Sequence, residues 1–312
     1  LPFRRPFTGS LPNLTPRLSI AMLAEVFTAV IAHQQAIKPD VSLQWLDFFL
    51  RLIVVALVAV SLVDSSRRLY WLSTTMALSF GFHTTKGGLA SILGGGVKFY
   101  EGLGGAFIDN NSYAIGGVMV MPLLWAGGRL VPEGIPFRKM IRTFAYAAIP
   151  LTAFFVISPL SRGGFLAMGA GLLLWLALQR RRFATVLVIS VALLAILPFV
   201  PMPEGYSERV QTIQTYEEVQ DESAISRLHF WRVALDMVAD HPMGVGLFNF
   251  QPYYNQYDSS DGAYGTNRSV HSSHLQILTE TGFLGLGLWI FLFTSSIVIC
   301  LRVRRVSSTA GL

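Results

Sequence analysis

Residues 183–200 read FATVLVISVALLAILPFV, and residues 275–300 read LQILTETGFLGLGLWIFLFTSSIVIC. A helix needs roughly 20 apolar residues to cross a bilayer, and each run supplies about that length. Between them lies the one long polar segment, residues 201–273, with four arginines and three histidines, and His274 follows directly. This pattern predicts an all-helical, polytopic membrane protein with one large loop outside the bilayer.

The composition of the whole chain agrees with this class. Of 312 residues, 52% are hydrophobic and only 13% are charged, against about 25% in ordinary soluble domains. The mean hydropathy is +0.51 and the pI is near 9.6. A basic pI can indicate nucleic-acid binding, but here the basic residues gather at the ends of apolar runs, as membrane topology requires. The single Cys300 excludes a disulfide within the chain and a cysteine-cluster metal site.

Eight apolar stretches predict membrane spans, at residues 17–33, 46–63, 69–86, 113–127, 141–159, 164–178, 183–200 and 275–300. We therefore divide the chain into a transmembrane bundle at 1–200, a loop domain with short helices at 201–273, and a last span with its tail at 274–312. Because the chain begins with Leu1 rather than Met and opens in a loop, we expect further spans upstream.

Charge predicts the orientation of these spans. With alternating spans, 15 of the 24 Lys and Arg residues fall on one side, mostly in short loops, and eight fall on the other. Short loops rich in Lys and Arg stay in the cytoplasm. Both ends of the chain are therefore expected in the cytoplasm, and the loop at 201–273 is expected outside.

A second external segment, at about 87–112, is rich in glycine and too poor in apolar residues to span. It follows Lys86 and includes Gly94, Gly95 and Gly96. Glycine at this density permits unusual backbone angles. Two interpretations stay open: a flexible connector, or a partly re-entrant loop that lines a cavity.

Within the long loop, an external helix is expected at about 223–240. The residues Asp221-Glu222-Ser223 suit a helix start, and His241-Pro242 suits a stop. Ile225, Leu228, Trp231, Leu235 and Val238 repeat at three and four and form one apolar stripe, which suits packing on the membrane helices. On the same helix, Arg227 and Arg232 either snorkel or pair with Asp236, or bind a ligand.

The segment after this helix mixes aromatic residues, Tyr253 and Tyr254 among them, with amides such as Asn249. Aromatic faces beside amides suit sugar recognition, and an aromatic belt at the membrane interface is the alternative.

His271 and His274 stand at the start of the last span, where helix N-termini favour anions. No third metal ligand accompanies them, so the sequence predicts no metal site. Glu280 lies inside the same span and is a functional candidate because ionisable groups at membrane depth are costly.

Arg162 stands between two apolar runs on the external side, in ISPLSRGGFLAMG. It suits a helix-end anchor. It equally suits a phosphate clamp, because a guanidinium presents a rigid fork of donors to phosphate oxygens.

Several segments together resemble the O-antigen ligase and polymerase superfamily of bacterial inner membranes. They are SRGGFLAMGAGLLLW at 161–175, SRLHFWRVALDMVADHPMGVGLFNF at 226–250 and VHSSHLQILTETGFLGLGLWIFLF at 270–293. The second carries the family's pattern of Arg, aromatic, helix, His-Pro and Gly-x-Gly. The third carries its pattern of His, Leu-Gln and Glu-x-Gly. Two earlier segments, LSFGFHTTKGGLASILGGG at 78–96 and AFIDNNSYAIGGVMVMPLL at 106–124, resemble a ligase-like branch of the same superfamily.

The resemblance implies a glycosyltransferase that moves a glycan from undecaprenyl-pyrophosphate to an acceptor, lipid A-core in the ligases, at the periplasmic face of the inner membrane. It implies no metal and no cofactor. By the motif match, Arg162 and Arg227 hold the pyrophosphate and His271 stands at the reacting centre. The chain departs from the family in having fewer spans and in having Ser272 where Asn is frequent.

Further residues are expected to bind substrate: Arg232, His274, Tyr253, Tyr254, Asn249, Glu280 and Lys86. The expected partners are the lipid-linked glycan, the acceptor and the bilayer, and not nucleic acid. Three alternatives stay open: a polymerase of glycan repeats, a protein O-oligosaccharyltransferase, and a transporter. A transporter usually carries ionisable residues at mid-membrane, whereas here they gather in one external loop.

Overall fold

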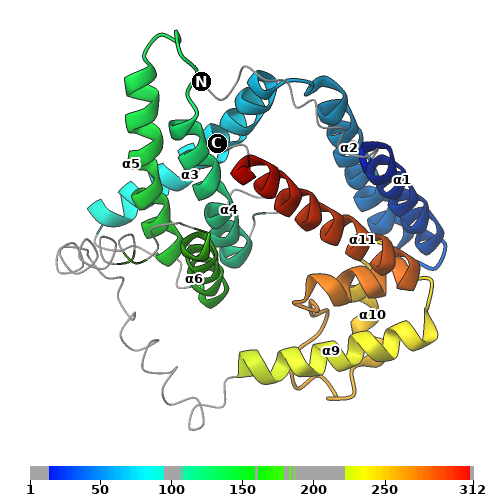
Figure 1. The fold of residues 1–312 in the computed structure, drawn as a ribbon. Coiled ribbons are helices and arrows are strands. Elements are labelled where there is room, and N and C mark those ends of the chain that lie inside the picture. The colour runs from blue at the N-terminus through cyan, green and yellow to red at the C-terminus, as the bar shows by residue number, and fades with distance from the viewer. Residues whose placement is uncertain are drawn as a thin grey trace. The chain divides into compact units, whose positions relative to one another are not determined.

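The computed structural model describes residues 14–94, 107, 109–158, 161–178, 183, 186 and 222–309, and the elements within them are helices (Figure 1). They are α1 (Leu14–His33), α2 (Pro39–Leu62), α3 (Ser66–Leu93), α4 (Asn110–Arg129), α5 (Arg138–Ile157), α6 (Arg162–Ala177), α9 (Glu222–Asp240), α10 (Phe250–Tyr257) and α11 (Ser273–Thr309). The chain forms two compact units, one from Leu1–Leu62 with Glu217–Leu312 and one from Val63–Tyr216.

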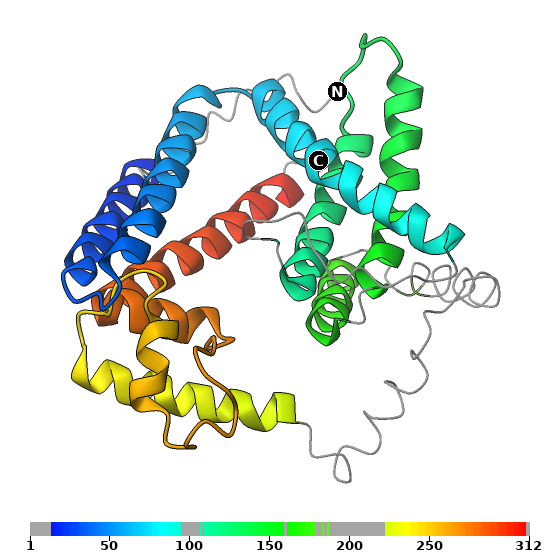
Figure 2. The same cartoon turned by 180° about the vertical axis from the view of Figure 1, so that it is seen from behind.

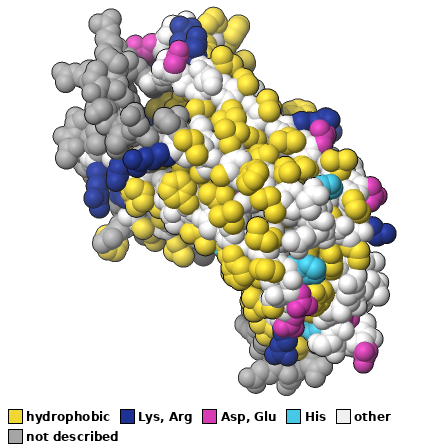
Figure 3. Space-filling view, turned by 90° about the vertical axis from the view of Figure 1, so that its right-hand side faces the viewer, with side chains coloured by type: hydrophobic (Ala, Val, Ile, Leu, Met, Phe, Trp, Pro, Cys, Tyr) yellow, Lys and Arg dark blue, Asp and Glu magenta, His cyan; other side chains and the backbone are white. Residues whose placement is uncertain are grey.

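Within the residues that the structure describes, three helices are long and apolar enough to cross a membrane: α2, α5 and Ser273–Arg305 within α11. Gly163–Ala177 is a shorter apolar helix. Helices stand at seven of the predicted spans, while the span predicted at 183–200 lies outside the described residues except for 183 and 186. Eight crossings therefore stay a prediction. Hydrophobic side chains cover much of the surface in Figure 3, and Val54, Val55 and Leu62 on α2 are among those exposed. A bilayer would cover such a surface.

The predicted Gly-rich segment at 87–112 was too long at both ends. Helix α3 continues to Leu93, and α4 begins at Asn110. Residues 95–106 and 108 lie outside the described residues. The packing of helices within the second unit accounts for the glycine in this last part of α3, because a Cβ at Gly88 would overlap the backbone carbonyl of Leu151 on α5. Small residues let membrane helices approach closely, so glycine here is a packing residue inside a helix and not a helix breaker.

In the first unit, α1 and α2 form a hairpin whose tip anchors the segment that follows α9. Asn249 is fully buried, and its side-chain Oδ1 accepts from Lys38 N at 2.8 Å while Nδ2 donates to Lys38 O at 3.3 Å. Tyr253 Oη donates to Gln35 O at 2.7 Å, and His241 Nδ1 lies 3.2 Å from Gln35 Oε1. The hairpin and α11 lie side by side in both views (Figures 1 and 2).

A sharp bend divides α11 into two parts. Gly282 has φ 74° and ψ −172°, which no helical residue adopts, and the bend brings His274 and Trp289 together at 4.8 Å between ring centroids. Residues 242–246 cross the bend and satisfy the backbone groups that it leaves without helical partners. The bonds are Val245 N to Thr279 O at 2.9 Å, Gly246 N to Glu280 O at 3.1 Å and Phe283 N to Pro242 O at 3.2 Å. The HPMGVG and TETG motifs thus meet in space.

Candidate functional site

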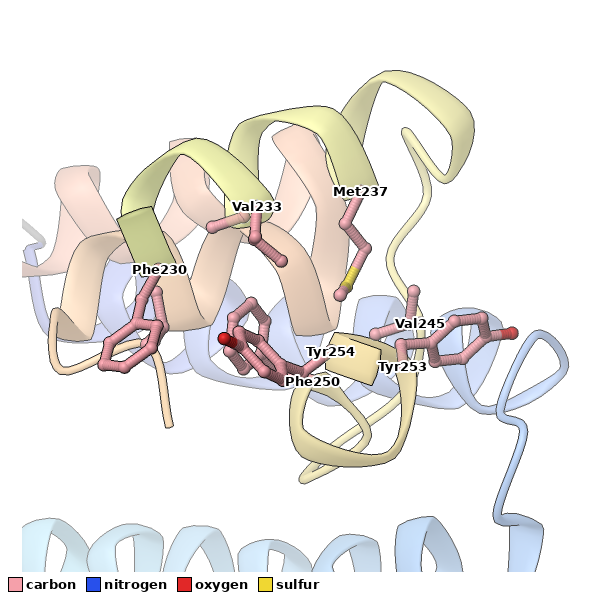
Figure 4. Close-up of a cluster of buried hydrophobic side chains, with 9 residues drawn as sticks. Phe230, Val233, Met237, Val245, Phe250, Tyr253 and Tyr254 are labelled. Carbon is pink, nitrogen blue, oxygen red and sulfur yellow. The ribbon is translucent and has the colours of Figure 1, made fainter. Parts of the chain in front are cut away.

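The predicted helix at 223–240 is confirmed as α9, and one of its faces carries the core that α9 shares with α10 and the residues that follow it. Phe230, Val233 and Met237 are nearly fully buried. They point toward Phe250 and Tyr254 of α10 (Figure 4). This cluster holds α9 and α10 together.

A second face of α9 is apolar but exposed. Leu228, Trp231 and Leu235 are 64%, 38% and 55% exposed, so only Val238 of the predicted stripe is nearly fully buried. Apart from Val238, the stripe is therefore exposed within the described residues of its unit, and its packing on other membrane helices stays a prediction. At 100° per residue, Arg227 and Arg232 lie on opposite sides of this stripe, and both side chains are exposed. Cationic groups that flank an apolar stripe suit the headgroup level of a membrane.

After α10 the chain returns along that helix through residues 258–272, which we name the His271 segment. Two side chains of α10 one turn apart hold it. Gln251 Nε2 donates to Ser269 Oγ at 2.7 Å. Asn255 exchanges two bonds with Asn267, one from Asn255 Nδ2 to Asn267 Oδ1 at 3.1 Å and one from Asn267 N to Asn255 Oδ1 at 2.8 Å. The segment is therefore fixed in register against α10.

The start of the His271 segment is bound to α9 by a nearly buried hydrogen-bonding contact between His229 and Asp258. His229 Nε2 lies 2.7 Å from Asp258 Oδ1, and the two side chains are only 12% and 7% exposed. Burial alone would raise the pKa of Asp258. Hydrogen bonds from Ser260 Oγ and N, from His229 and from Gly262 N outweigh it and lower this pKa to about 2. Asp258 is thus a carboxylate with a full set of donors.

The end of the His271 segment lies against the next residue of α9. The guanidinium carbon of Arg268 lies 5.9 Å from the ring centroid of Phe230, and the His271 ring lies 6.0 Å from it. His271 is exposed and left-handed, with φ 51°. The structure therefore places one arginine and one histidine beside the same aromatic ring, at the surface and next to the start of α11.

The residues predicted to recognise sugar have structural contacts. Tyr254 is fully buried, and its hydroxyl lies near Asp258 and Ser260 without a hydrogen bond of good geometry within the described residues. Burial first, and then the Asp258 charge, raise the pKa of Tyr254. The ring of Tyr253 is buried too, and Asn249 is committed to Lys38. That these three also bind substrate stays a prediction.

The other predicted residues of this unit lie around the bend of α11. His274 is exposed and contacts Trp289. Glu280 is buried, and its carboxylate accepts from Gln276 Nε2 at 3.2 Å.

Arg162 and Lys86 belong to the second unit. Arg162 is the first residue of α6, whose N-cap Ser161 accepts from Gly164 N at 2.9 Å and donates to Asn111 Oδ1 at 2.6 Å. Through this contact the SRGG motif meets the NNSYA motif at the start of α4. The side chain of Arg162 is outside the described residues. Lys86 is exposed on α3.

His229, Asp258, Phe230 and Arg268 were not among the site residues predicted from the sequence. Their one sequence signal was a histidine between an arginine and an aromatic residue, in RLHF at 227–230. Among the described residues, no three His, Cys, Asp or Glu side chains gather in a way that could hold a metal ion. A metal-free reaction stays a prediction.

Comparison with known proteins covers two of the motif segments, 161–175 and 226–250, in full and most of a third, 270–293, but not the earlier segments at 78–96 and 106–124. Residues 147–290 match a family model described as O-antigen ligase. No curated protein and no solved structure matches the chain. The match begins within α5, includes α6, α9 and α10, and ends within α11. With helices apolar enough to cross a membrane, the chain is a membrane protein, and its residues 147–290 match the O-antigen ligase family, which supports its place in that superfamily.

Proposed function

We propose that the protein is an O-antigen ligase-like glycosyltransferase. It transfers a glycan from undecaprenyl-pyrophosphate to lipid A-core at the periplasmic face of the inner membrane, without a metal. The observation that carries this proposal is the extent of the family match. Residues 147–290 include Arg162, Arg227 and His271, the three residues that the motifs single out.

The proposed reaction needs a base for the acceptor hydroxyl and cationic donors for the pyrophosphate, and these side chains can supply both. A hydroxyl oxygen of the acceptor attacks the anomeric carbon of the donor, and the bond from that carbon to the pyrophosphate oxygen breaks. The electron pair leaves with the pyrophosphate, and the hydroxyl proton passes to the imidazole of His271. A positioned base of this kind contributes about 10²–10⁴-fold in rate.

Arg227 is proposed to stabilise the charge that grows on the leaving pyrophosphate. Its side chain is exposed beside the apolar stripe of α9, which suits a donor with a lipid tail and an anionic head. Preorganised donors of this kind are worth a few kcal/mol each, about 3 kcal/mol in measured cases. Arg162 is proposed as a second donor contact on the sequence motif alone, and Arg232, His274, Glu280 and Lys86 as further substrate contacts.

The direct test mixes the purified protein with undecaprenyl-pyrophosphate glycan and lipid A-core. The expected product is a larger lipopolysaccharide band. His271→Ala should abolish it and leave donor binding intact, because the base acts on the other substrate. His241→Ala is the matched control, since His241 lies on the loop after α9 and contacts Gln35. Near-normal ligation by His271→Ala at normal protein levels would refute the assigned mechanism.

The same assay separates the alternatives. A polymerase would lengthen the lipid-linked glycan when the donor alone is supplied. A protein O-oligosaccharyltransferase would need a protein acceptor, and a transporter would move glycan across vesicles without forming a bond. Transfer that survives EDTA is expected, whereas loss on chelation and recovery with one metal would overturn the metal-free proposal.

A further inference from the structure

The His271 segment has a backbone that needs outside support. Residues 258–272 form no helix or strand, and Asp261, Asn267 and His271 all have left-handed φ between 51° and 52°. Each such residue costs about 1–3 kcal/mol, and the conformation persists only where surrounding contacts over-determine it. The position of His271 therefore depends on the contacts that hold this segment.

Two successive residues of α9 hold the two ends of the segment. His229 binds Asp258 at its start with the 2.7 Å contact. Phe230 contacts Arg268 and His271 at its end. Between these ends, Asn255 and Gln251 of α10 fix the register. The same helix carries Arg227 less than one turn before His229.

From this geometry we infer that His229, acting through Asp258, is a positioning residue. It fixes the His271 segment on α9 and so sets the spacing between Arg227 and His271. The inference rests on the proposed function for its catalytic consequence, because Arg227 is there a donor contact and His271 the base. Removing the pair shifts His271 relative to the donor, and a misplacement of about 1 Å can cost on the order of 100-fold in rate.

The position of the bond on the ring allows a sharp test. Asp258 binds Nε2, and the amide nitrogen of glutamine can take the place of that atom. His229→Gln keeps a donor to Asp258 but cannot carry a proton in catalysis, whereas His229→Leu removes the donor. His241→Leu is the control for loss of a half-buried histidine in this part of the chain, because His241 contacts the α1–α2 tip and not the His271 segment.

We expect His229→Leu to lower kcat on the order of 10–100-fold while the KM for the donor changes little. His229→Gln should recover most of the loss, and His241→Leu should have kinetics close to wild type. If His229→Gln is as inactive as His229→Leu, His229 takes part in proton transfer and the positioning role is wrong. A loss that appears only in the KM for the donor would also overturn it.

Hydrogen exchange in residues 258–271 tests the positioning role of His229 without any measurement of glycan transfer. His229→Leu should speed exchange in this segment, and His229→Gln should restore the protection. If the wild-type protein transfers no glycan, the proposed function fails, and the exchange data still decide the positioning role. Unchanged exchange in His229→Leu would refute it, even if the wild type is an active ligase.

Discussion

Gly282 provides the sharpest test of the fold that supports the site. Its φ of 74° and ψ of −172° lie in a region that is essentially restricted to glycine. A Cβ there would stand 2.7 Å from Met243 C and 2.8 Å from Met243 Cα, and it would also overlap Pro242 O. These are backbone atoms that cannot rotate away.

The expected cost of Gly282→Ala is the sum of two effects. Backbone strain in such a region costs about 1–3 kcal/mol, and forcing atoms into a filled space costs about 1–3 kcal/mol. Gly282→Ala should therefore destabilise the protein by about 4 kcal/mol. For a protein of this size, that loss lowers the unfolding temperature by roughly 10 °C.

Gly287→Ala is the matched control, because it lies five residues further along α11 and a Cβ there meets no atom within 4 Å. Alanine in a helix interior is neutral or more stable than glycine by up to about 1 kcal/mol. The assay is thermal unfolding in detergent, followed by tryptophan fluorescence, with the amount of folded protein from each strain. Equal unfolding temperatures for the two variants would show that α11 does not bend at Gly282.

Four further outcomes are expected. Arg227→Ala should weaken donor binding, as isothermal titration would measure. Arg227→Lys should restore that binding only poorly, because a point charge does not replace a bidentate fork. The pKa of Asp258 in the folded protein, about 2, lies below its unfolded value of about 3.9. Its ionisation therefore stabilises the fold by about 2 kcal/mol above roughly pH 5, and this is lost as the pH falls toward 2. Asp258→Asn should flatten that acid dependence in unfolding curves measured across pH. Met237→Ala should cost about 2–5 kcal/mol because the side chain is fully buried, whereas Leu235→Ala on the exposed face should change stability by less than about 0.5 kcal/mol. A cysteine at Ser260 should react with a membrane-impermeant reagent on spheroplasts, and its protection would invert the predicted topology.

Local signals in the sequence predicted the helices well where caps and periodicity agreed. The start and stop signals of α9 placed that helix within one residue at each end. By contrast, the Gly-rich segment after Lys86 was interpreted as a loop from its first residue, although the helix continues through Gly87 and Gly88 to Leu93. In a sequence, glycine indicates the end of a helix. Only the close packing of Leu151 against α3 shows why this helix contains Gly88.

The contacts that organise the site could not be predicted, because they join residues with no shared periodicity. His229 and Asp258 are 29 positions apart, and nothing in the intervening residues indicates that they meet. Tyr253 and Tyr254 are neighbours that face different partners, one toward Gln35 and one toward Phe230. Their mixture with amides resembles a sugar site in sequence, yet in the structure the same side chains form the core.

The anchoring of Asn249 on Lys38 has a consequence for how the protein is made. These residues are 211 positions apart, and the unit Val63–Tyr216 is synthesised between them. The tip of the α1–α2 hairpin can therefore gain these contacts only after residue 249 has been synthesised. The inserted unit can complete its own packing first, since domains generally fold in the order of their synthesis. Ribosome-arrested chains that end before residue 249 should thus hold a protease-resistant Val63–Tyr216 unit beside a hairpin tip that is still open to cleavage.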